Sequence, residues 1–466
     1  MSELNDQEKA EESARKFNNI LKVRDDHEPL HFTKTEAGTF ELRDDAGSTW
    51  LDGDELSYKS LRKYIEPWLT ALFQSEHLSL LAGSGLTHAI HRTATGKLAA
   101  DMSGEVTNGE YKDKIIEAAE KSAQRAGRKQ SNIEDQIRIA NELLRGMEIA
   151  NKQPDKANAL RTEITNTLEN LAVAILQSEK NIATSGEGER ERAFNALITF
   201  LMSFSSRTGT RDRLNIFTTN YDRLIEAGAE LAGLHLLDRF VGTLMPIFRS
   251  SRLDLDMHYN PPGIRGEPRY LEGVARFTKL HGSVDWVQTE QDIRRMGLPF
   301  GADSVAPFLG APGMGEVTSH RLMIYPNSAK DRETAEYPYV ELFRDLAAAV
   351  CRPNSTLVTY GYSFGDEHIN RVIRDMLTIP STHLVVISMD DNLGRIQALA
   401  KERKSQVSIL IGPQLADLET LTEHFLPKAA IDRTTFRMAE LLKQRYGIEG
   451  QGKKPAPEGE HRGDMP

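Results

Sequence analysis

Cysteine is nearly absent from this chain, because Cys351 is the single one among 466 residues. One cysteine cannot form a disulfide within the chain or build a zinc site that depends on several cysteines. The N-terminal stretch lacks the basic-then-apolar layout of a signal peptide, and no apolar run reaches the roughly 18–20 residues that cross a bilayer. We therefore expect a protein of the reducing cytoplasm with no cysteine-built zinc site and no membrane segment.

An excess of positive charge is also missing. Acidic residues number 68 and basic residues 58, so the formal net charge is −10. This balance argues against direct nucleic-acid binding through the whole surface, although it is compatible with a local basic patch. The length allows two or three domains and a sizeable core.

Short apolar runs that end in glycine or polar residues recur along the chain. They predict buried strands at His77–Leu81, Arg213–Phe217, Phe277–Leu280, Leu322–Tyr325, Ser355–Tyr360, His383–Ser388 and Val407–Ile411. Helical patterns follow several of these runs, as at 224–233 and 366–377. Because alternating strands and helices are typical of a parallel sheet, we predict an α/β protein with a Rossmann-like, doubly wound sheet.

The segments between these runs have other patterns. Residues 1–22 show a modest helical period (Phe17, Ile20, Leu21), LHFTKTEAGTFELRD alternates like a hairpin, and SLRKYIEPWLTALF has the period of an amphipathic helix. Residues 101–205 predict helices at 112–126, 132–150, 156–180 and 189–205, a helical insertion with solvated charged faces. Glycine and proline punctuate 235–276 and 290–320, which predicts irregular structure and a loop or lid.

Four short motifs stand where predicted strands end. They are Gly83–Thr87, Thr218–Asp222, Lys279–Ser283 and Gly361–Asp366. Open parallel sheets bind ligands at the carboxyl ends of their strands, so these motifs predict one shared dinucleotide site. A Gly-Ser-Gly turn ahead of a helix lets the backbone approach a phosphate closely, although His88 replaces the third glycine of the full fingerprint.

Each motif also has a structural interpretation. The glycine pair is compatible with a plain tight turn, and Thr218, Thr219 or Asn220 with an N-cap of the next helix. Asn220 and Asp222 lie two residues apart, so in extended backbone their side chains share a face and together can hold a carboxamide and a water molecule. His281 is placed like a general base, but a lone histidine is often structural.

Taken together, the four motifs resemble those of the sirtuin family, and more closely its bacterial sirtuin-like NADase branch. The family's G-A-G-x-S loop is similar to Gly83–Thr87, its T-Q-N-x-D motif to Thr218–Asp222, and its histidine followed by glycine to His281 and Gly282. A later G-T/Y-S element is similar to Gly361–Ser363. The resemblance covers about residues 75–100 and 210–400.

This resemblance implies roles for individual residues. Thr87, Asn220 and Asp222 would line the nicotinamide pocket, with His281 beside the nicotinamide ribose, and the catalytic residues would be Asn220, Asp222 and His281. The remaining NAD+ contacts implied are Gly83, Ser84 and Gly85 at the pyrophosphate, and Gly361, Tyr362, Ser363, Ser388 and Asp390 toward the adenosine half.

The departures from the family shift the expected chemistry. Deacylating sirtuins usually carry four cysteines on a zinc ribbon, which this chain cannot build, and the spacing from Asp222 to His281 is much longer than theirs. The resemblance therefore implies NAD+ hydrolysis to nicotinamide and ADP-ribose, with NAD+ as substrate and no zinc. By analogy alone, it implies a regulated effector of bacterial anti-phage defence, a HerA-type ATPase partner and a large homo-oligomer.

Two other functions stay open. One is a protein deacylase or ADP-ribosyltransferase, and the other is a non-catalytic module that binds NAD+ or ADP-ribose. We divide the chain into an N-terminal helix and hairpin entry segment (1–74), a sirtuin-like NAD-binding catalytic domain (75–100 and 206–430), the helical insertion (101–205), a C-terminal helix (431–446, with its pattern at 432–445) and a disordered tail (447–466).

Overall fold

The computed structural model describes most of the chain up to Pro427. The described residues are 18–23, 26, 28–43, 56–99, 109–125, 130–151, 153–206, 212–254, 258–259, 269–270, 273–314, 321–323 and 337–427. All of them belong to one compact unit, Met1–Pro427, and a second unit comprises Lys428–Pro466. The predicted C-terminal helix and tail, and residues 1–17 at the other end, lie outside the described residues.

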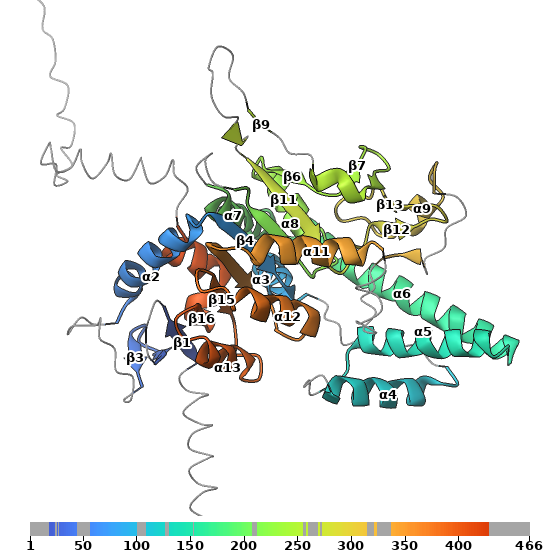
Figure 1. The fold of residues 1–466 in the computed structure, drawn as a ribbon, viewed down its shortest axis with the longest axis horizontal. Coiled ribbons are helices and arrows are strands. Elements are labelled where there is room, and N and C mark those ends of the chain that lie inside the picture. Colours follow the sequence, from blue (N-terminus) through green and yellow to red (C-terminus); the bar gives the residue numbers. More distant parts are fainter. Residues whose placement is uncertain are drawn as a thin grey trace, which may run out of the picture. The chain divides into compact units, whose positions relative to one another are not determined.

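A ten-stranded sheet forms the centre of the first unit (Figure 1), in the order β3-β2-β1-β16-β15-β14-β4-β5-β11-β6. The seven strands from β16 to β6 are parallel, as predicted for a doubly wound α/β protein. They are β4 (His77–Ala82), β5 (Asn215–Thr218), β6 (His235–Leu237), β11 (Val274–Lys279), β14 (Ser355–Tyr360), β15 (His383–Ser388) and β16 (Val407–Ile411). The predicted Rossmann-like fold class is therefore confirmed.

Helices cover both faces of this sheet. Successive residues of a strand point to opposite faces, and on β15 Val385 packs in one core cluster while Val386 packs in the other. The first cluster includes α2 (Tyr58–Phe73), α3 (Ser84–Thr95), α7 (Glu187–Ser205) and α8 (Leu224–Leu231), and the second includes α11 (Tyr339–Val350), α12 (Glu367–Met376) and α13 (Arg395–Glu402). Strands buried on both faces read as continuous apolar runs, which is why most of them were predictable.

The N-terminal residues contain a strand where the sequence favoured a helical period. β1 (Asn19–Lys22) pairs antiparallel with β16 and with β2 (Leu30–Lys34), and β3 (Phe40–Leu42) completes the predicted hairpin. The helical interpretation of Ile20 and Leu21 was wrong, because four residues buried on both sides leave no period to detect. Lys22 is buried, and its Nζ donates to the carbonyl oxygens of Lys404 and Val407.

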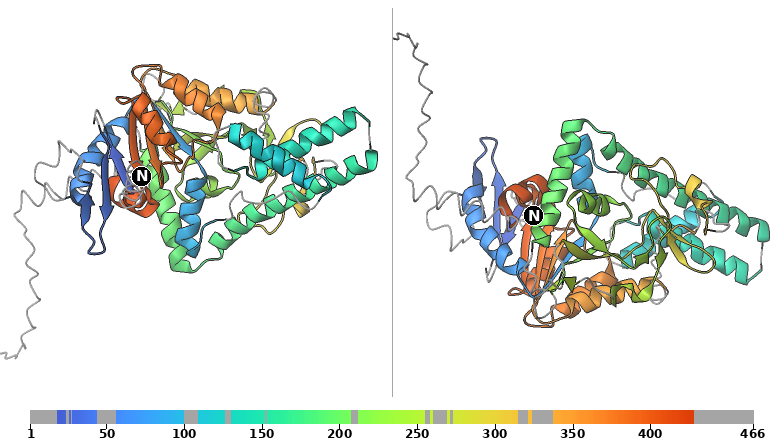
Figure 2. Two further views of the ribbon diagram at one scale, coloured as in Figure 1. Left: turned by 90° about the horizontal axis from the view of Figure 1, so that it is seen from below. Right: turned by 90° about the horizontal axis from the view of Figure 1, so that it is seen from above.

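The four predicted helices between 101 and 205 are all present. α4 (Lys112–Arg125), α5 (Ile133–Ile149) and α6 (Pro154–Ala183) extend away from the sheet in all views (Figures 1 and 2). They share a third core cluster with buried side chains between Val284 and Met314 and with Leu322. By contrast, α7 belongs to the first cluster and packs on α3 and α8. The boundary of the predicted insertion stays a prediction.

The glycine- and proline-rich segments are more ordered than predicted. β12 (Trp286–Gln288), β13 (Ile293–Arg295), β8 (Ile247–Phe248) and β7 (Phe240–Val241) form a second sheet, and β6 joins the main one. Strands of two or three residues carry no detectable period, so the sequence indicated only irregular structure. Of the strand predicted at Leu322–Tyr325, Leu322 forms a single bridge to Val287, and its last two residues lie outside the described ranges.

The other described elements are short. They are η1 (Ser250–Asp254), β9 (His258–Tyr259), β10 (Arg269–Tyr270), α9 (Ala306–Leu309), α14 (Pro413–Ala416), α15 (Leu418–Thr420) and a π-type turn, η3 (Leu421–Phe425). Within the described part of the chain, no helix has both the length and the apolar character needed to cross a membrane.

Candidate functional site

The four motifs meet at one edge of the main sheet. Their strands are consecutive neighbours in the order β14-β4-β5-β11, and parallel strands end at the same edge. Backbone hydrogen bonds join the motifs where the strands stop: Gly83 N donates to Tyr360 O at 2.9 Å, Thr219 N to Ala82 O at 3.3 Å and Leu280 N to Thr218 O at 2.8 Å. We call the loops Gly83–Thr87, Thr218–Asp222, Lys279–Ser283 and Gly361–Asp366 the four-loop site.

The glycines of this site allow two loops to approach each other closely. A Cβ on Gly85 would lie 2.5 Å from the Cα of Gly361, and a Cβ on Gly83 would lie 2.5 Å from the oxygen of Gly361. Gly361 itself has φ +61°, a left-handed conformation that favours glycine. Since the N–H groups of Gly83 and Gly85 both donate to β14 and the loop after it, these two groups are already occupied.

The helix after the glycine loop starts within the motif. α3 begins at Ser84 with Gly83 as its N-cap, so Ser84, Gly85 and Thr87 lie in its first turn rather than ahead of it. A helix N-terminus attracts negative charge through its unpaired N–H groups and its dipole. The exposed Ser84 lies at this positive end.

Thr87 connects the two polar side chains of the second motif. The Nδ2 of Asn220 donates to the Oγ1 of Thr87 at 2.9 Å and to the carbonyl oxygen of Gly83 at 2.9 Å. The Oγ1 of Thr87 in turn donates to the Oδ2 of Asp222 at 2.5 Å. Asn220 and Asp222 therefore share a face, as predicted. The Oδ1 of Asn220 has no partner among the described residues and remains an acceptor.

The alternative that Thr218, Thr219 or Asn220 caps the next helix was wrong. α8 begins at Leu224, and the Oδ1 of Asp222 accepts the N–H of Leu224 at 3.1 Å. Thr218 instead donates its hydroxyl to Ala82 O at 2.9 Å. Asn220 is thus free of a capping role, and both oxygens of Asp222 accept hydrogen bonds.

His281 is paired with an acid from the fourth motif. Its Nε2 lies 2.9 Å from the Oδ2 of Asp366, and both side chains are largely buried. The Oδ1 of Asp366 caps α12 by accepting the N–H of His368 at 2.9 Å, which fixes the carboxylate in place. A carboxylate on Nε2 favours the proton on that nitrogen and leaves Nδ1 as an acceptor.

The turn after His281 is held tightly. Gly282 has φ +90°, and a Cβ there would overlap the carbonyl oxygen of Met323, which accepts the N–H of Ser283 at 2.9 Å. The ring of Tyr221 lies 6.5 Å from the ring of His281. Segment 321–323 therefore closes over the turn that presents the histidine.

The helices of the 101–205 region contact the site at two points. The hydroxyl of Tyr221 donates to Glu134 of α5 at 3.0 Å, and burial raises the pKa of Tyr221 well above its ordinary value, so the hydroxyl stays a donor. Arg223 donates from its backbone N to Glu179 of α6 at 2.8 Å and forms a buried ion pair with the same carboxylate. The second motif is therefore anchored to α5 and α6 on both sides of Asp222.

The residues expected at the adenosine half lie at the ends of β14 and β15. Tyr362 is buried and donates its hydroxyl to Asp366 O and to Asn370, both at 3.2 Å, while Ser363 is exposed. Ser388 is buried and accepts Nδ2 of Asn392 at 3.1 Å. The exposed Asp390 accepts the N–H of Asn392 at 2.8 Å. Ser363 and Asp390 are accordingly the accessible members of this group.

Lys279 connects the four-loop site to its surroundings. Its Nζ donates to the carbonyl oxygen of Asp222 and lies 3.0 Å from the Oε1 of Glu226 on α8. The lysine is buried, so this shared contact satisfies its charge. Sequence reasoning named Lys279 only as part of its motif and did not find this connection.

Asp366 is the main site residue whose role sequence reasoning missed. An aspartate directly before a predicted helix is a signal for an N-cap, and its place in the fourth motif put it at the right edge. Its partner His281 lies 85 positions earlier, so no local pattern joins the two. Across the described ranges, no cluster of three or more His, Cys, Asp or Glu is arranged to hold a metal, and the expectation of a zinc-free chain stays a prediction.

Comparison with protein-family models matches residues 214–409 to the SIR2-like domain. A comparison with curated proteins gave no match. The matched range runs from the start of β5 into β16 and includes three of the four loops, while the glycine loop lies more than a hundred residues before it and reaches the site through β4. The match is consistent with NAD-related activity, and the SIR2-like domain at residues 214–409 supports a sirtuin-like family for this chain.

Proposed function

We propose that this protein hydrolyses NAD+ to nicotinamide and ADP-ribose at the four-loop site. The observation that carries the proposal is the pairing of His281 with Asp366 at the same sheet edge as the Asn220–Thr87–Asp222 network. The SIR2-like match supports a NAD-dependent enzyme in general terms. The choice of water as the acceptor is our own inference.

The residues present fit a dinucleotide. The N-terminus of α3, with the exposed Ser84, offers positive partial charge to a pyrophosphate. A side chain at Gly83 or Gly85 would clash with the loop of Gly361. The two glycines therefore allow this loop to pack closely against the N-terminus of α3. Asn220 presents a carbonyl oxygen that suits a hydroxyl, an amide N–H or a water molecule.

In the proposed reaction the bond between nicotinamide and ribose breaks and a water oxygen bonds to the ribose carbon. Nicotinamide leaves as a neutral base, and positive charge develops on the ribose, as in other glycosidic cleavages. The Oδ1 of Asn220 orients the water or a ribose hydroxyl, and the Nδ1 of His281 accepts the proton that the water loses. Asp222 holds Thr87 and, through it, the amide of Asn220.

We also propose that this activity is regulated, as an effector that depletes NAD+ during anti-phage defence. Unregulated hydrolysis of NAD+ would kill the host cell, and the helices that bear Glu134 and Glu179 contact the second motif directly. We propose that regulation of NAD+ hydrolysis acts through these two helices. A HerA-type ATPase partner and a homo-oligomer are proposed from the family resemblance alone.

Product analysis tests the reaction. The full chain is incubated with NAD+ alone, with NAD+ and an acetyl-lysine peptide, and with NAD+ and a HerA-type ATPase, and the products are separated by chromatography. The proposal predicts equal amounts of nicotinamide and ADP-ribose without peptide, with the ATPase altering the rate if it is the regulator.

Two other results would replace this proposal. Nicotinamide release that requires the peptide would indicate a deacylase, and ADP-ribose attached to protein would indicate a transferase. Binding of NAD+ with no release under any condition would make the chain a binding module.

A further inference from the structure

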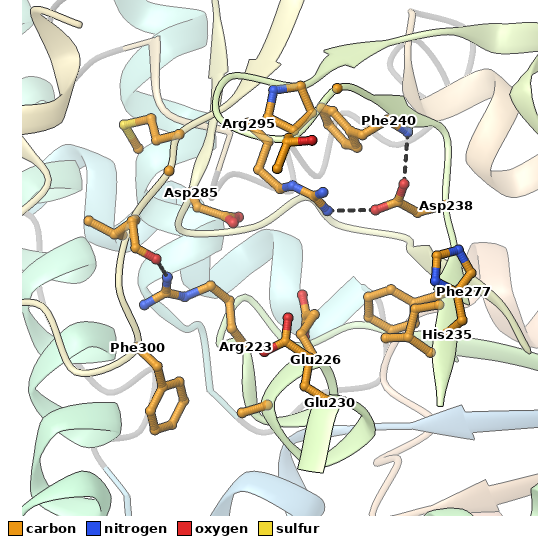
Figure 3. Close-up of a pocket in the computed structure, with 18 of the residues that line it drawn as sticks. Arg223, Glu226, Glu230, His235, Asp238, Phe240, Phe277, Asp285, Arg295 and Phe300 are labelled. Atoms are coloured by element: carbon orange, nitrogen blue, oxygen red, sulfur yellow. Dashed lines mark hydrogen bonds and ion pairs between the residues drawn. The ribbon is translucent and has the colours of Figure 1, made fainter. Parts of the chain in front are cut away.

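A cavity of about 580 Å³ lies beside α8, outside the four-loop site (Figure 3). Its walls come from α8, β6, the loop after β6 and the segment around β13, and we call it the α8 cavity. This volume lies in the range of pockets that hold small molecules, about 300–1,000 Å³. Phe240, Phe277 and Phe300 contribute aromatic wall.

Asp285 is a buried carboxylate without a hydrogen bond. Its side chain lines the cavity, the residue is 6% exposed, and no described residue donates to it. Figure 3 shows its carboxylate directed into the space between the side chains of Arg223 and Arg295. A buried carboxylate that lacks a donor costs several kcal/mol or more, so this arrangement favours a ligand that supplies one.

Neither arginine satisfies Asp285. Arg223 is engaged by Glu179 and by the carbonyl oxygens of Leu298 and Pro299, and Arg295 lies 2.6 Å from Asp238. Both cations are therefore directed to other acceptors.

Glu226 provides a second acceptor, on the α8 side of the cavity. Lys279 occupies its Oε1 at 3.0 Å, whereas its Oε2 is buried and has no partner among the described residues. Glu230 and Asp238 add two more acids to the lining. Four acids against two engaged arginines disfavour an anion, so the cavity does not suit the pyrophosphate of a dinucleotide.

We propose that the α8 cavity binds a small organic cation, a primary amine or guanidinium on an apolar body, with Asp285 and Glu226 as its hydrogen-bond acceptors. The ammonium or guanidinium donates to the carboxylates of Asp285 and Glu226, and the phenylalanine rings cover the apolar part and attract the cation. This inference is independent of the proposed hydrolysis, because the cavity lies outside the four loops. Lys279 links the two places, since it contacts both Glu226 and the backbone of Asp222.

Calorimetric titration of the full chain at pH 8 and constant ionic strength tests the proposal. The probes are 1,5-diaminopentane and agmatine, and 1,5-pentanediol is the neutral control of the same length as the diamine. We expect one molar equivalent of at least one cation to bind and the diol not to bind. Asp285→Asn and Glu226→Gln keep the side-chain shapes and should each weaken binding by about tenfold or more.

The matched control is Glu290→Gln, which changes an exposed carboxylate near Asp285 that does not line the cavity and should leave binding unchanged. Circular dichroism and thermal unfolding establish that each variant is folded, and Glu226→Gln keeps the test decisive if Asp285→Asn does not fold. Absence of binding by both cations overturns the proposal. So does equal binding of the diol, or binding that neither cavity variant weakens.

Discussion

The four-loop site and the α8 cavity are both rich in carboxylates, but they differ in how these groups are paired. At the site, Asp222 accepts hydrogen bonds from Thr87 and Leu224, and Asp366 accepts one from His281. In the cavity, Asp285 has no donor among the described residues. The site is therefore preorganised by the chain itself, whereas the cavity is completed only by something that enters it.

This difference follows from how each place is built. The site uses loops at the ends of adjacent parallel strands, which the sheet holds in register. The cavity combines α8, the edge strand β6 of the main sheet and β13 of the second sheet, so its shape depends on how these separate elements pack. Single substitutions in the four-loop site and in the α8 cavity test this difference.

The largest expected effect is the loss of the site's close backbone contact. Gly361→Ala places a Cβ 2.5 Å from the Cα of Gly85 and also strains a backbone at φ +61°. We expect the free energy of unfolding to fall by about 1–3 kcal/mol from overpacking and by about 1 kcal/mol more from the strained backbone. We also expect NAD+ hydrolysis to be lost. Chemical denaturation and nicotinamide release measure the two effects.

Gly96→Ala is the matched control, because Gly96 has φ +73° but open space around it. The free energy of unfolding of Gly96→Ala should fall only by the backbone contribution, and the variant should keep NAD+ hydrolysis. Equal losses in both variants would show that the contact with Gly85 is not what constrains Gly361.

The next effect concerns the pairing of His281. Asp366→Asn allows an amide N–H to face Nε2, which favours the wrong tautomer of the imidazole. We expect kcat to fall by about 10²–10⁴-fold, because the imidazole is then held in the wrong tautomer, while KM changes little. A rise in KM with kcat unchanged would indicate that Asp366 serves substrate binding instead.

Glu226 gives the cavity a pH dependence. Burial raises its pKa to about 7, while Lys279 opposes this shift, and Asp285, Arg295 and Arg223 are the other charges that bear on the group. Between about pH 4.5 and 7 the folded state keeps a proton that the unfolded chain has lost, so this group's contribution lowers stability as pH rises.

Glu226→Gln removes this contribution. We expect the variant to gain up to about 3 kcal/mol relative to the parent at pH 8 and little at pH 4.5, measured by denaturant unfolding at both values. A gain of equal size at the two pH values would mean that Glu226 ionises normally in the fold.

The smallest effect is expected at the contact between the site and α5. Tyr221→Phe removes the hydroxyl that donates to Glu134 at 3.0 Å. The free energy of unfolding should fall by about 1 kcal/mol, and basal hydrolysis should change by only a few-fold. Tyr111→Phe is the control, since its hydroxyl makes an exposed contact of 3.4 Å elsewhere.

Much of the sheet and the place of the site could be predicted from sequence. Strands such as Ser355–Tyr360 and His383–Ser388 are buried on both faces, so their apolar runs are continuous. The motifs at their ends then had to lie at one edge. By contrast, β1 has four residues and β7 has two, and such lengths carry neither a helical nor a strand period.

The cavity could not be predicted because its groups come from distant parts of the chain. Glu226 and Asp285 are far apart in sequence and belong to no shared motif. The same reason hid the contact between Tyr221 and Glu134, which depends on where α5 packs. Tertiary contacts of this kind leave no local signal in composition or spacing.

Nicotinamide release by the parent chain and by His281→Ala tests the central claim most directly. The account predicts that the parent releases nicotinamide from NAD+ without a peptide, with its regulator present if one is required, and that the variant is slower by about 10²–10⁴-fold. Thermal unfolding and NAD+ binding of the variant should stay close to those of the parent. Equal rates in the two proteins would contradict the account, because the four-loop site would then not be where NAD+ is cleaved.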